Sequence, residues 1–535
     1  MSPDLASVSV VADVAFSPDL LVGLTPEQRE AVTSPAKRLI VRATAGSGKT
    51  HVLTLRIQRR IAAGELQPSE VLAMTFTRKA GDELNKRLWR AGIGRMRAGT
   101  FHRAALDLVN RHRADHELRP IVVDPNRRGI VRLLLTQLRD EGTLKIEEWE
   151  FPQIEIEIGW ALSQGLNGAS YASHARRVRR KTPLAPAVFA DVLDRYVGLC
   201  RSRGVVDFDL LLSEAVALLQ NDQAVREGFR HTTRALFVDE TQDMNPLQFH
   251  LLKLMAGDDP DLFCVGDPNQ SIYGFNGASP RLLDEVTATW PDTVTLDLTR
   301  NHRSTAHIVA VATTMIERGA AALEPAKEGG EIPLVRDYDT DVEEAEAVAK
   351  WLVARHTPGT PWSSMAVLAR TNKQLQFLQP FLERADIPFE LRGAEHGPGL
   401  NEEKNDEEDE REDDGPRDAV ALSTIHRSKG LEFAHVATIG WAEGILPNYN
   451  ATSDADLAEE KRLAYVALSR AESTLLLTWS RAKDEPRHPN RTPSRFLGPI
   501  EAEIERLRQT NAPLEGDARK ARLAAIRASL ERTDA

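Results

Sequence analysis

The segment Ala43–Thr50, with the sequence ATAGSGKT, constrains the fold of this chain more than any other. It follows the apolar run 39–41, which is typical of a buried parallel strand, and it precedes a helical pattern from His51 to Ala63. A loop of small residues at the start of a helix can present backbone N–H groups to phosphate oxygens. Ala43 stands where the usual P-loop pattern has its first glycine. A Gly/Ser-rich turn is the alternative, but such a turn does not need a Lys-Thr pair just inside a helix.

Two side chains of this segment carry the expected phosphate chemistry. The Lys49 ammonium can neutralise the β- and γ-phosphates of a nucleotide, and the Thr50 hydroxyl can ligate Mg²⁺. The residues of the segment that we expect to bind the nucleotide are Ala43, Thr44, Ala45, Gly46, Ser47, Gly48, Lys49 and Thr50.

Acidic and amide side chains follow two further apolar runs. The run 235–238 ends in Asp239 and Glu240, and the run 262–265 is followed closely by Gln270. Successive side chains on a strand point to opposite sides, so Asp239 can hold Mg²⁺ while Glu240 orients or deprotonates the attacking water. Gln270 can sense a γ-phosphate and a water together, because a carboxamide both donates and accepts. An exposed acidic turn is the alternative for the Asp-Glu pair, but three such runs predict an open α/β sheet with its site at the strand tips.

Ten motifs in a fixed order give the chain a specific resemblance from about Leu24 to about Leu497. They are LTPEQREAV (24–32), ATAGSGKT (43–50), TFTRKAGDEL (75–84), GTFHRAAL (99–106), DFDLLL (207–212), VDETQDMNPLQ (238–248), VGDPNQSIYGFNGA (265–278), LTRNHRST (298–305), STIHRSKGLEF (423–433) and KRLAYVALSRA (461–471). The sequence resembles the UvrD/Rep/PcrA-type DNA helicases of superfamily 1A. The resemblance implies ATP and Mg²⁺ as cofactors, and single-stranded and tailed duplex DNA as partners.

The resemblance assigns further residues to the ATP site. Gln28 is expected to read adenine, since a carboxamide can pair with the N6/N7 edge. Arg303 and Arg470 are expected to reach the γ-phosphate from the second motor domain, where a guanidinium stabilises transition-state charge. Glu432 is expected near the ATP sugar, and His302 replaces the Tyr that the family stacks on adenine, so weaker stacking is expected. The expected catalytic residues are Lys49, Glu240, Gln270, Arg303 and Arg470.

Aromatic and basic residues of the motif loops are expected to face DNA. Aromatic residues make up only 6% of the chain, so their concentration in these loops favours base stacking, which tolerates any sequence. Core placement at strand ends is the alternative for Phe76 and Phe101. Asn276 stands where the family usually has Arg, so one backbone or coupling contact is expected to be weaker. The expected DNA-binding residues are Phe76, Arg78, Phe101, His102, Tyr273, Phe275 and His426, with Lys79, Arg103 and Arg427 as further phosphate contacts.

Composition limits the other classes of function. No apolar run approaches the roughly 20 residues that a membrane-spanning helix needs, so no membrane span is expected. The segment before Gly23 lacks a basic region and predicts a loose tail, not a secretory signal. The two cysteines, Cys200 and Cys264, are far apart in apolar contexts, so neither a zinc site nor a disulfide framework is expected. This cysteine usage fits a reducing cytoplasm, where we expect the protein to act.

The formal net charge of −11 is unusual for a DNA-binding protein, but much of it is local. The block 401–414 (NEEKNDEEDEREDD) holds ten acids and two bases, a net of −8, which leaves −3 for the rest of the chain. A solvated linker is the expected form of this block, and a DNA-mimicking inhibitory strand is the alternative. The related helicases carry a 2B subdomain in this span. Only the short segment 394–417 separates Gly393 from Asp418, so we expect that subdomain to be missing.

The predicted fold class is α/β, with two RecA-like (P-loop) parallel-sheet domains and an inserted helical subdomain. The predicted map has a flexible tail 1–23, a first RecA-like ATP-binding domain 24–105 and 205–290, a helical 1B-like insertion 106–204, a second RecA-like domain 291–400 and 415–500, an acidic linker 401–414 in place of 2B, and a helical tail 501–535.

These patterns predict an ATP-dependent single-stranded DNA translocase and DNA helicase, acting in DNA repair, recombination or replication. The 3′→5′ polarity rests on the resemblance alone. A translocase that strips proteins from DNA with little unwinding is one alternative, and a non-catalytic DNA-binding scaffold is another. A scaffold need not keep all six polar residues of the site, which are Lys49, Asp239, Glu240, Gln270, Arg303 and Arg470.

Overall fold

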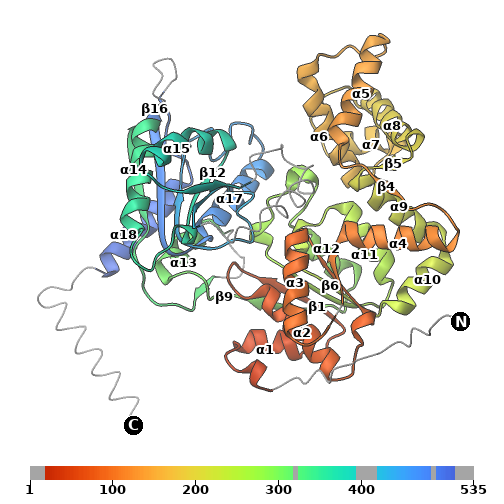
Figure 1. Ribbon diagram of the computed structural model, residues 1–535, viewed down its shortest axis with the longest axis horizontal. Helices are drawn as coiled ribbons and strands as arrows, with labels where there is room; N and C mark the ends of the chain where they lie inside the picture. Colours follow the sequence, from red (N-terminus) through yellow and green to blue (C-terminus); the bar gives the residue numbers. More distant parts are fainter. Residues whose placement is uncertain (1–17, 95, 317–322, 393–417, 483–489, 512–535) are drawn as a thin grey trace, which may run out of the picture. The chain divides into compact units, whose positions relative to one another are not determined.

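A computed structural model describes most of the chain (Figure 1). The described residues are 18–94, 96–316, 323–392, 418–482 and 490–511. Contacts divide them into two compact units: the first contains the residues up to Arg303 together with 323–324, and the second contains 304–316, 325–392 and the residues from Asp418 onward. The predicted acidic linker 401–414 lies outside the described residues, as do most of the N-terminal tail and residues 512–535 of the C-terminal tail.

The first unit is built on a six-stranded sheet in the order β3-β2-β6-β7-β1-β8, and every neighbouring pair is parallel. The strands are β1 (Arg38–Ala43), β2 (Val71–Thr75), β3 (Arg97–Thr100), β6 (Ala235–Val238), β7 (Asp261–Gly266) and β8 (Val294–Leu298). The strands β2 and β6 are buried along their whole length, as expected for a parallel sheet covered on both faces. The three predicted strands are β1, β6 and β7, and their carboxyl ends lie at one edge.

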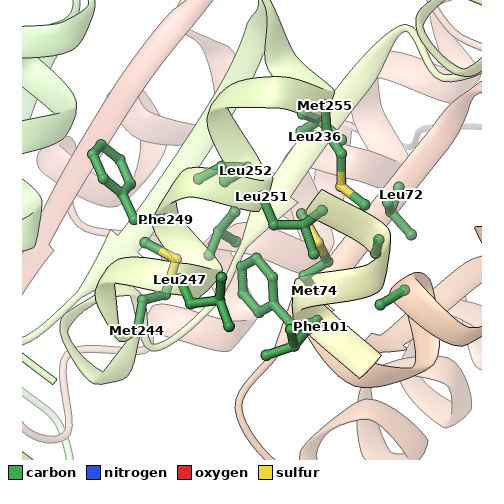
Figure 2. Close-up of a cluster of buried hydrophobic side chains, with 14 of the residues drawn as sticks. Leu72, Met74, Phe101, Leu236, Met244, Leu247, Phe249, Leu251, Leu252 and Met255 are labelled. Atoms are coloured by element: carbon green, nitrogen blue, oxygen red, sulfur yellow. The ribbon is translucent and has the colours of Figure 1, made fainter. Parts of the chain in front are cut away.

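Two helical layers cover this sheet. The cluster on one face takes residues from α1 (Pro26–Thr33), α2 (Lys49–Ala62) and α3 (Arg78–Arg90). The cluster on the other face takes residues from α4 (Phe101–Asp115), α9 (Phe208–Asn221), α10 (Gln223–Thr232), α11 (Pro246–Ala256) and α12 (Leu282–Thr289). Figure 2 shows part of the second cluster, where Leu247 and Leu251 of α11 lie near Phe101 and Met74.

The helical insertion has its own apolar core and is narrower than predicted. It comprises α5 (Arg127–Asp140), α6 (Phe151–Ser163), α7 (Gly168–Arg177) and α8 (Pro186–Ser202). The chain enters and leaves it through two short parallel strands, β4 (Val122–Val123) and β5 (Val205–Val206). The predicted start at residue 106 is wrong, because Leu108 and Val109 of α4 pack in the core of the first sheet.

The second unit contains another six-stranded parallel sheet, in the order β11-β16-β15-β12-β14-β13. The strands are β11 (Leu334–Thr340), β12 (Met365–Ala369), β13 (Phe389–Leu391), β14 (Val420–Thr424), β15 (Phe433–Thr438) and β16 (Ala471–Ala482). The helices are α13 (Ala306–Thr313), α14 (Asp341–Arg355), α15 (Asn372–Arg384), α17 (Asp454–Leu468) and α18 (Leu497–Asn511). Two parallel sheets in two units confirm the predicted fold class.

The first compact unit runs past residue 291, where the second RecA-like domain is predicted to begin. Strand β8 pairs with β1, with Ile40 opposite Thr295, and the chain stays with the first unit as far as Arg303. Two short strands, β9 (Arg300–Asn301) and β10 (Glu324–Pro325), follow β8 in sequence. The described part of the predicted C-terminal tail is helical and belongs to α18. The apolar residues Ile500, Ile504 and Leu507 of α18 are buried.

A network of buried charged residues joins the insertion to the rest of the first unit. Arg127 of α5 donates from Nε to Asp207 at 2.7 Å and from Nη2 to Asp209. Asp207 also accepts the Tyr196 hydroxyl at 2.6 Å and caps α9 through the Leu210 N–H at 2.7 Å. Burial disfavours the charge of Asp207, but Arg127 and the hydrogen bonds outweigh burial and lower its pKa. Asp207 therefore remains an anion whose counterion is supplied by the insertion.

We expect Arg127→Met to lower the free energy of unfolding by about 3–5 kcal/mol, because it leaves the buried Asp207 carboxylate without its main counterion. Urea unfolding of the first unit measures the loss. The matched control is Arg195→Ala, which breaks an exposed pair with Asp191 and should cost less than about 1 kcal/mol. Equal losses in the two variants would show that the buried pair contributes no more to the free energy of unfolding than the exposed pair does.

Candidate active site

The P-loop forms the turn between β1 and α2. Gly46 and Gly48 have φ of +69° and +82°, in the left-handed region that favours glycine. A Cβ at Gly46 would lie 2.8 Å from Cβ of Arg303 and 2.9 Å from Nδ2 of Asn301. The loop is therefore both conformationally demanding and closely packed, and α2 begins immediately after it at Lys49.

The segment after β8 holds the P-loop from outside. The N–H and hydroxyl of Thr44 both donate to the Leu298 carbonyl, at 3.0 and 3.1 Å. The Asn301 side chain donates from Nδ2 to the Ala45 carbonyl at 2.8 Å. Sequence reasoning missed this role of Asn301, although the residue lies in the LTRNHRST motif. No local pattern distinguishes an amide that binds a distant loop from one that binds solvent.

Arg303 belongs to the same unit as the P-loop. The His302 N–H donates to the Gly46 carbonyl at 2.9 Å, and the Arg303 N–H donates to Asn301 Oδ1 at 2.9 Å. Both residues lie at the end of the first compact unit, immediately before Ser304, where the second unit begins. His302 is exposed at the surface, and partial desolvation of its imidazole, followed by the Arg300 charge, lowers its pKa. A neutral imidazole suits the stacking role expected of this position.

Gln28 contacts the P-loop with the side chain predicted to read adenine. Its Nε2 donates to the Ser47 carbonyl at 2.9 Å, and its Oε1 accepts the Thr25 N–H at 3.0 Å. The second bond belongs to a capping box that starts α1. A carboxamide has two N–H groups and two lone pairs, so these bonds use half of its capacity. Both bonds hold the Gln28 side chain beside the P-loop.

The predicted acidic pair meets the P-loop side chains. Lys49 Nζ lies 3.3 Å from the Glu240 carboxylate, and the Thr50 hydroxyl donates to Asp239 at 3.0 Å. Burial, then the charge of Glu240, raises the pKa of Asp239 to about 6, and Lys49 opposes this shift. Glu240 has φ of +50°, which is unusual for a residue with a Cβ. The structure thus brings these four predicted residues together.

Two glutamines extend this cluster. Gln270 donates from Nε2 to Asp267 at 2.7 Å. Gln242 accepts the Asp267 N–H at 2.9 Å and donates to the Glu240 carboxylate. A Cβ at Gly266 would lie 2.4 Å from Gln242 Oε1, so the bridge needs glycine there. Gln242 belongs to the VDETQDMNPLQ motif but has no role predicted from sequence, because its bridge needs Asp267, which follows another strand.

The oxygen ligands fit a magnesium ion that is shared with a nucleotide. Among the described residues, no group of three or more His, Cys, Asp or Glu could hold a metal ion. Thr50 and Asp239 supply two oxygens, and Mg²⁺ commonly completes its shell with substrate phosphates and water. Lys49 and the backbone of the loop can bind the phosphates, and Glu240 can orient a water.

In the second unit, the sheet brings Arg470 and Glu432 together. Arg470 is buried and donates to the carbonyls of Leu431 and Val466, at 3.0 and 3.1 Å. The Phe433 N–H donates to the Arg470 carbonyl at 3.0 Å, so Glu432 lies between two residues that contact Arg470. These bonds, with a further one to the Ser469 hydroxyl, fix the orientation of the buried guanidinium.

His426 is held in its neutral form. Burial, followed by the charges of Arg370 and Lys429, lowers the pKa of His426 to about 3. At neutral pH this predicted DNA-binding residue can therefore offer a hydrogen bond, but not a positive charge.

Three of the predicted DNA-facing aromatic residues form one cluster. Phe76 stacks on Tyr273 with ring centroids 4.9 Å apart and an angle of 26° between planes. Tyr273 meets Phe275 edge-on at 6.0 Å, and Phe275 is 37% exposed. The prediction for Phe101 is wrong, because it is 2% exposed and packs in the core shown in Figure 2. His102 lies edge-on to Phe208 at 5.5 Å.

The parallel sheet, the P-loop and the facing carboxylates define a P-loop nucleoside-triphosphatase domain. The family model described as the UvrD/REP helicase N-terminal domain matches residues 24–291. The UvrD-like helicase C-terminal domain matches residues 296–396 and 400–482. The chain therefore belongs to the UvrD/Rep helicase family.

Relatives of known name support this assignment. The chain is 31% identical to the ATP-dependent DNA helicase UvrD2 of Mycobacterium tuberculosis over an alignment of 609 residues that includes gaps. The alignment covers 96% of this chain and 85% of that protein. It is 33% identical over 428 residues to UvrD1 of the same organism, covering 76% of this chain and 54% of the relative. It is 30% identical over 390 residues to DNA helicase II of Escherichia coli, covering 71% and 52%. In the described part of the chain, no helix has the length and apolar character to cross a membrane.

We expect Gln242→Ala to slow ATP hydrolysis by about 10- to 100-fold with little change in nucleotide affinity, because Glu240 loses a bond that orients it. Single-turnover hydrolysis and nucleotide titration separate the two effects. The matched control is Gln248→Ala, which removes a capping-box side chain of α11 and should leave the hydrolysis step unchanged. Equal slowing in both variants would indicate a general loss of structure.

Proposed function

We propose that this UvrD-family protein uses ATP and Mg²⁺ to translocate along single-stranded DNA and to separate duplex strands with 3′→5′ polarity. The observation that carries the proposal is the pairing of Lys49 with Glu240 and of Thr50 with Asp239 at the P-loop. A scaffold protein would have no need to hold two carboxylates against these two residues. Action in the cytoplasm, in repair, recombination or replication of DNA, belongs to the same proposal.

Each residue of the cluster has one task in this proposal. Lys49 binds the β- and γ-phosphates, and Thr50 and Asp239 hold Mg²⁺. Bound Mg²⁺ neutralises charge on the phosphate oxygens. Glu240 orients the attacking water, and Gln242 keeps Glu240 in place. When ATP binds, Lys49 exchanges the Glu240 carboxylate for phosphate, which leaves Glu240 able to accept a proton from water.

The guanidinium groups of Arg303 and Arg470 are each proposed to bind the γ-phosphate, as the resemblance to the family implies. Arg303 follows the segment that holds the P-loop, and Arg470 is oriented by backbone carbonyls of the second unit. Both are always charged, so both can stabilise the negative charge that grows on the γ-phosphate. Gln28 and His302 are proposed to contact adenine, and Glu432 the sugar.

The loop after β7 connects the phosphate chemistry to DNA. Gln270 binds Asp267 near the carboxylates, and Tyr273 and Phe275 follow closely in sequence. A change in the Gln270 contact on hydrolysis therefore reaches the stacked aromatic rings through a very short backbone segment. Stacking on any base gives the grip that a sequence-independent motor needs. Arg78, Lys79, Arg103 and Arg427 are proposed as phosphate contacts. His102 is proposed as a stacking ring, and His426 as a neutral hydrogen-bond donor or acceptor.

A translocase with little unwinding is the second candidate, because only the short segment 394–417 separates Gly393 from Asp418 where related helicases carry the 2B subdomain. We propose that the chain lacks this subdomain. A monomer should then unwind short 3′-tailed duplexes without oligomerising, and should do so with low processivity.

Single-turnover strand separation on 3′-tailed, 5′-tailed and blunt duplexes tests the proposal. We expect opening of the 3′-tailed duplex alone, and ATP turnover that rises strongly with single-stranded DNA. Glu240→Gln should bind ATP yet turn over at least about 100-fold slower, because the water loses its base. The control Glu285→Gln changes an exposed glutamate of α12 and should behave as wild type. Equal turnover with and without DNA would favour a scaffold, and stimulation without strand separation would favour the stripping translocase.

We expect Tyr273→Ala and Phe275→Ala each to weaken single-stranded DNA binding by roughly fivefold or more, while the DNA-free ATPase rate stays nearly constant. The reason is that stacking contributes about 1–3 kcal/mol per base and takes no part in phosphate chemistry. DNA titration of ATPase activity measures both quantities. Phe377→Ala is a matched control, because Phe377 is 41% exposed and Phe275 is 37% exposed. A variant that weakens DNA binding and lowers the DNA-free ATPase rate to the same extent would indicate that these rings stabilise the fold and do not contact the strand.

A further inference from the structure

A large groove crosses the first unit over β3, with α3 and α4 as its walls. Its volume is about 1440 Å³, which exceeds the roughly 300–1,000 Å³ of ordinary small-molecule pockets and suits a polymer. Six cationic side chains line the groove, namely Arg78, Lys86, Arg90, Arg97, Arg103 and Arg111. The acidic side chains in its lining are Asp82 and Asp107. This excess of positive charge is opposite in sign to the net charge of the whole chain, −11.

The cations of the groove differ in their partners. Arg103 pairs with Asp107 at 3.1 Å, and Arg97 donates to the Ser69 carbonyl at 2.9 Å. Within the described ranges, Lys86, Arg90 and Arg111 have no ion-pair partner within 4 Å, and all three are exposed. These three like charges repel one another, and a polyanion bound between them would reduce that cost.

An exposed indole lies among these charges. Trp89 is 69% exposed and stands in the last turn of α3, next to Arg90. A tryptophan so open to water contributes little to the core. An aromatic face beside cations is the arrangement on which single-stranded nucleic acids stack their bases while their phosphates are bound.

The groove begins where the DNA-facing motifs lie. Arg78, at the start of α3, and His102, at the start of α4, both line it. Both helices begin at the carboxyl edge of the sheet, since β2 and β3 are parallel. Helix α3 then returns toward the amino edge and covers about 18 Å between Arg78 and Arg90. That length matches about five nucleotides at the spacing of a stacked strand.

We propose that this groove binds an additional stretch of single-stranded DNA, continuous with the strand held at the motif loops. Trp89 stacks on a base, and Lys86, Arg90 and Arg111 contact phosphates. The inference rests on the proposed function in that single-stranded DNA is the ligand. The groove lengthens the bound strand and keeps it engaged while the motif loops release and rebind it.

The test compares oligothymidylates of about 8 and about 16 nucleotides by fluorescence anisotropy without ATP. The wild type should bind the longer strand more tightly and with a steeper salt dependence. Trp89→Ala should weaken binding of the longer strand by roughly tenfold and leave the shorter strand nearly unaffected. Replacing Lys86, Arg90 and Arg111 together by Gln should reduce the log–log salt slope for the longer strand by about 2.

Trp149→Ala is the matched control, because Trp149 is 70% exposed and lies on the insertion, outside the groove lining. It should bind both strands as the wild type does, and melting temperatures should agree among the variants with exposed replacements. Equal binding of the longer strand by Trp89→Ala and wild type would overturn the groove inference and leave the motor proposal intact. If the wild type binds neither strand and its ATPase rate does not change with DNA, the proposed function is overturned, and the groove inference that rests on it is overturned with it.

Discussion

The parallel pairing of β1 with a strand on each side is the constraint on which the site depends. Val41 lies opposite Val265 of β7 and opposite Leu296 of β8. These registers bring the ends of the three strands to one edge, and with them the P-loop, the Asp267 loop and the Asn301 segment. A slip of one residue would turn every side chain of β1 to the other face. Buried apolar pairs in the strands thus determine where the polar residues meet.

The polar residues at that edge work against stability. Asp239, Glu240 and Asp267 lie around one cation, Lys49, and burial raises the pKa of both aspartates. Glu240 also holds a left-handed backbone conformation, which costs of order 1–3 kcal/mol. The two apolar layers on the sheet offset these costs. A bound nucleotide with its metal ion would bring phosphates to Lys49 and a second positive charge to the carboxylates.

The parts of the site that were predictable from sequence are those built within one segment. The P-loop, the Asp-Glu pair and Gln270 each follow an apolar run, so strand pattern and residue type sufficed. Phe76 and Phe101 have the same local setting at strand ends, yet Phe76 joins a half-buried aromatic cluster and Phe101 fills a core. Burial is decided by helices distant in sequence, here α9 and α11, and no local pattern reports them. The bridges made by Gln242 and Asn301 depend on strand order in the same way.

The loop from Asp267 to Gly277 joins three regions of the first unit. Its first residue accepts Gln270 beside the carboxylates, and its middle residue Tyr273 carries the aromatic cluster. Its last residue meets the helical insertion, since a Cβ at Gly277 would lie 2.6 Å from the Ser163 hydroxyl. The insertion is itself joined to the rest of the first unit by the buried Arg127–Asp207 pair. Both ends of this loop are thus held by contacts, Asp267 by Gln242 and Gln270 and Gly277 by close packing on the insertion. Under the proposed function, the aromatic rings in between are the part left to move, and they are the part that holds the strand.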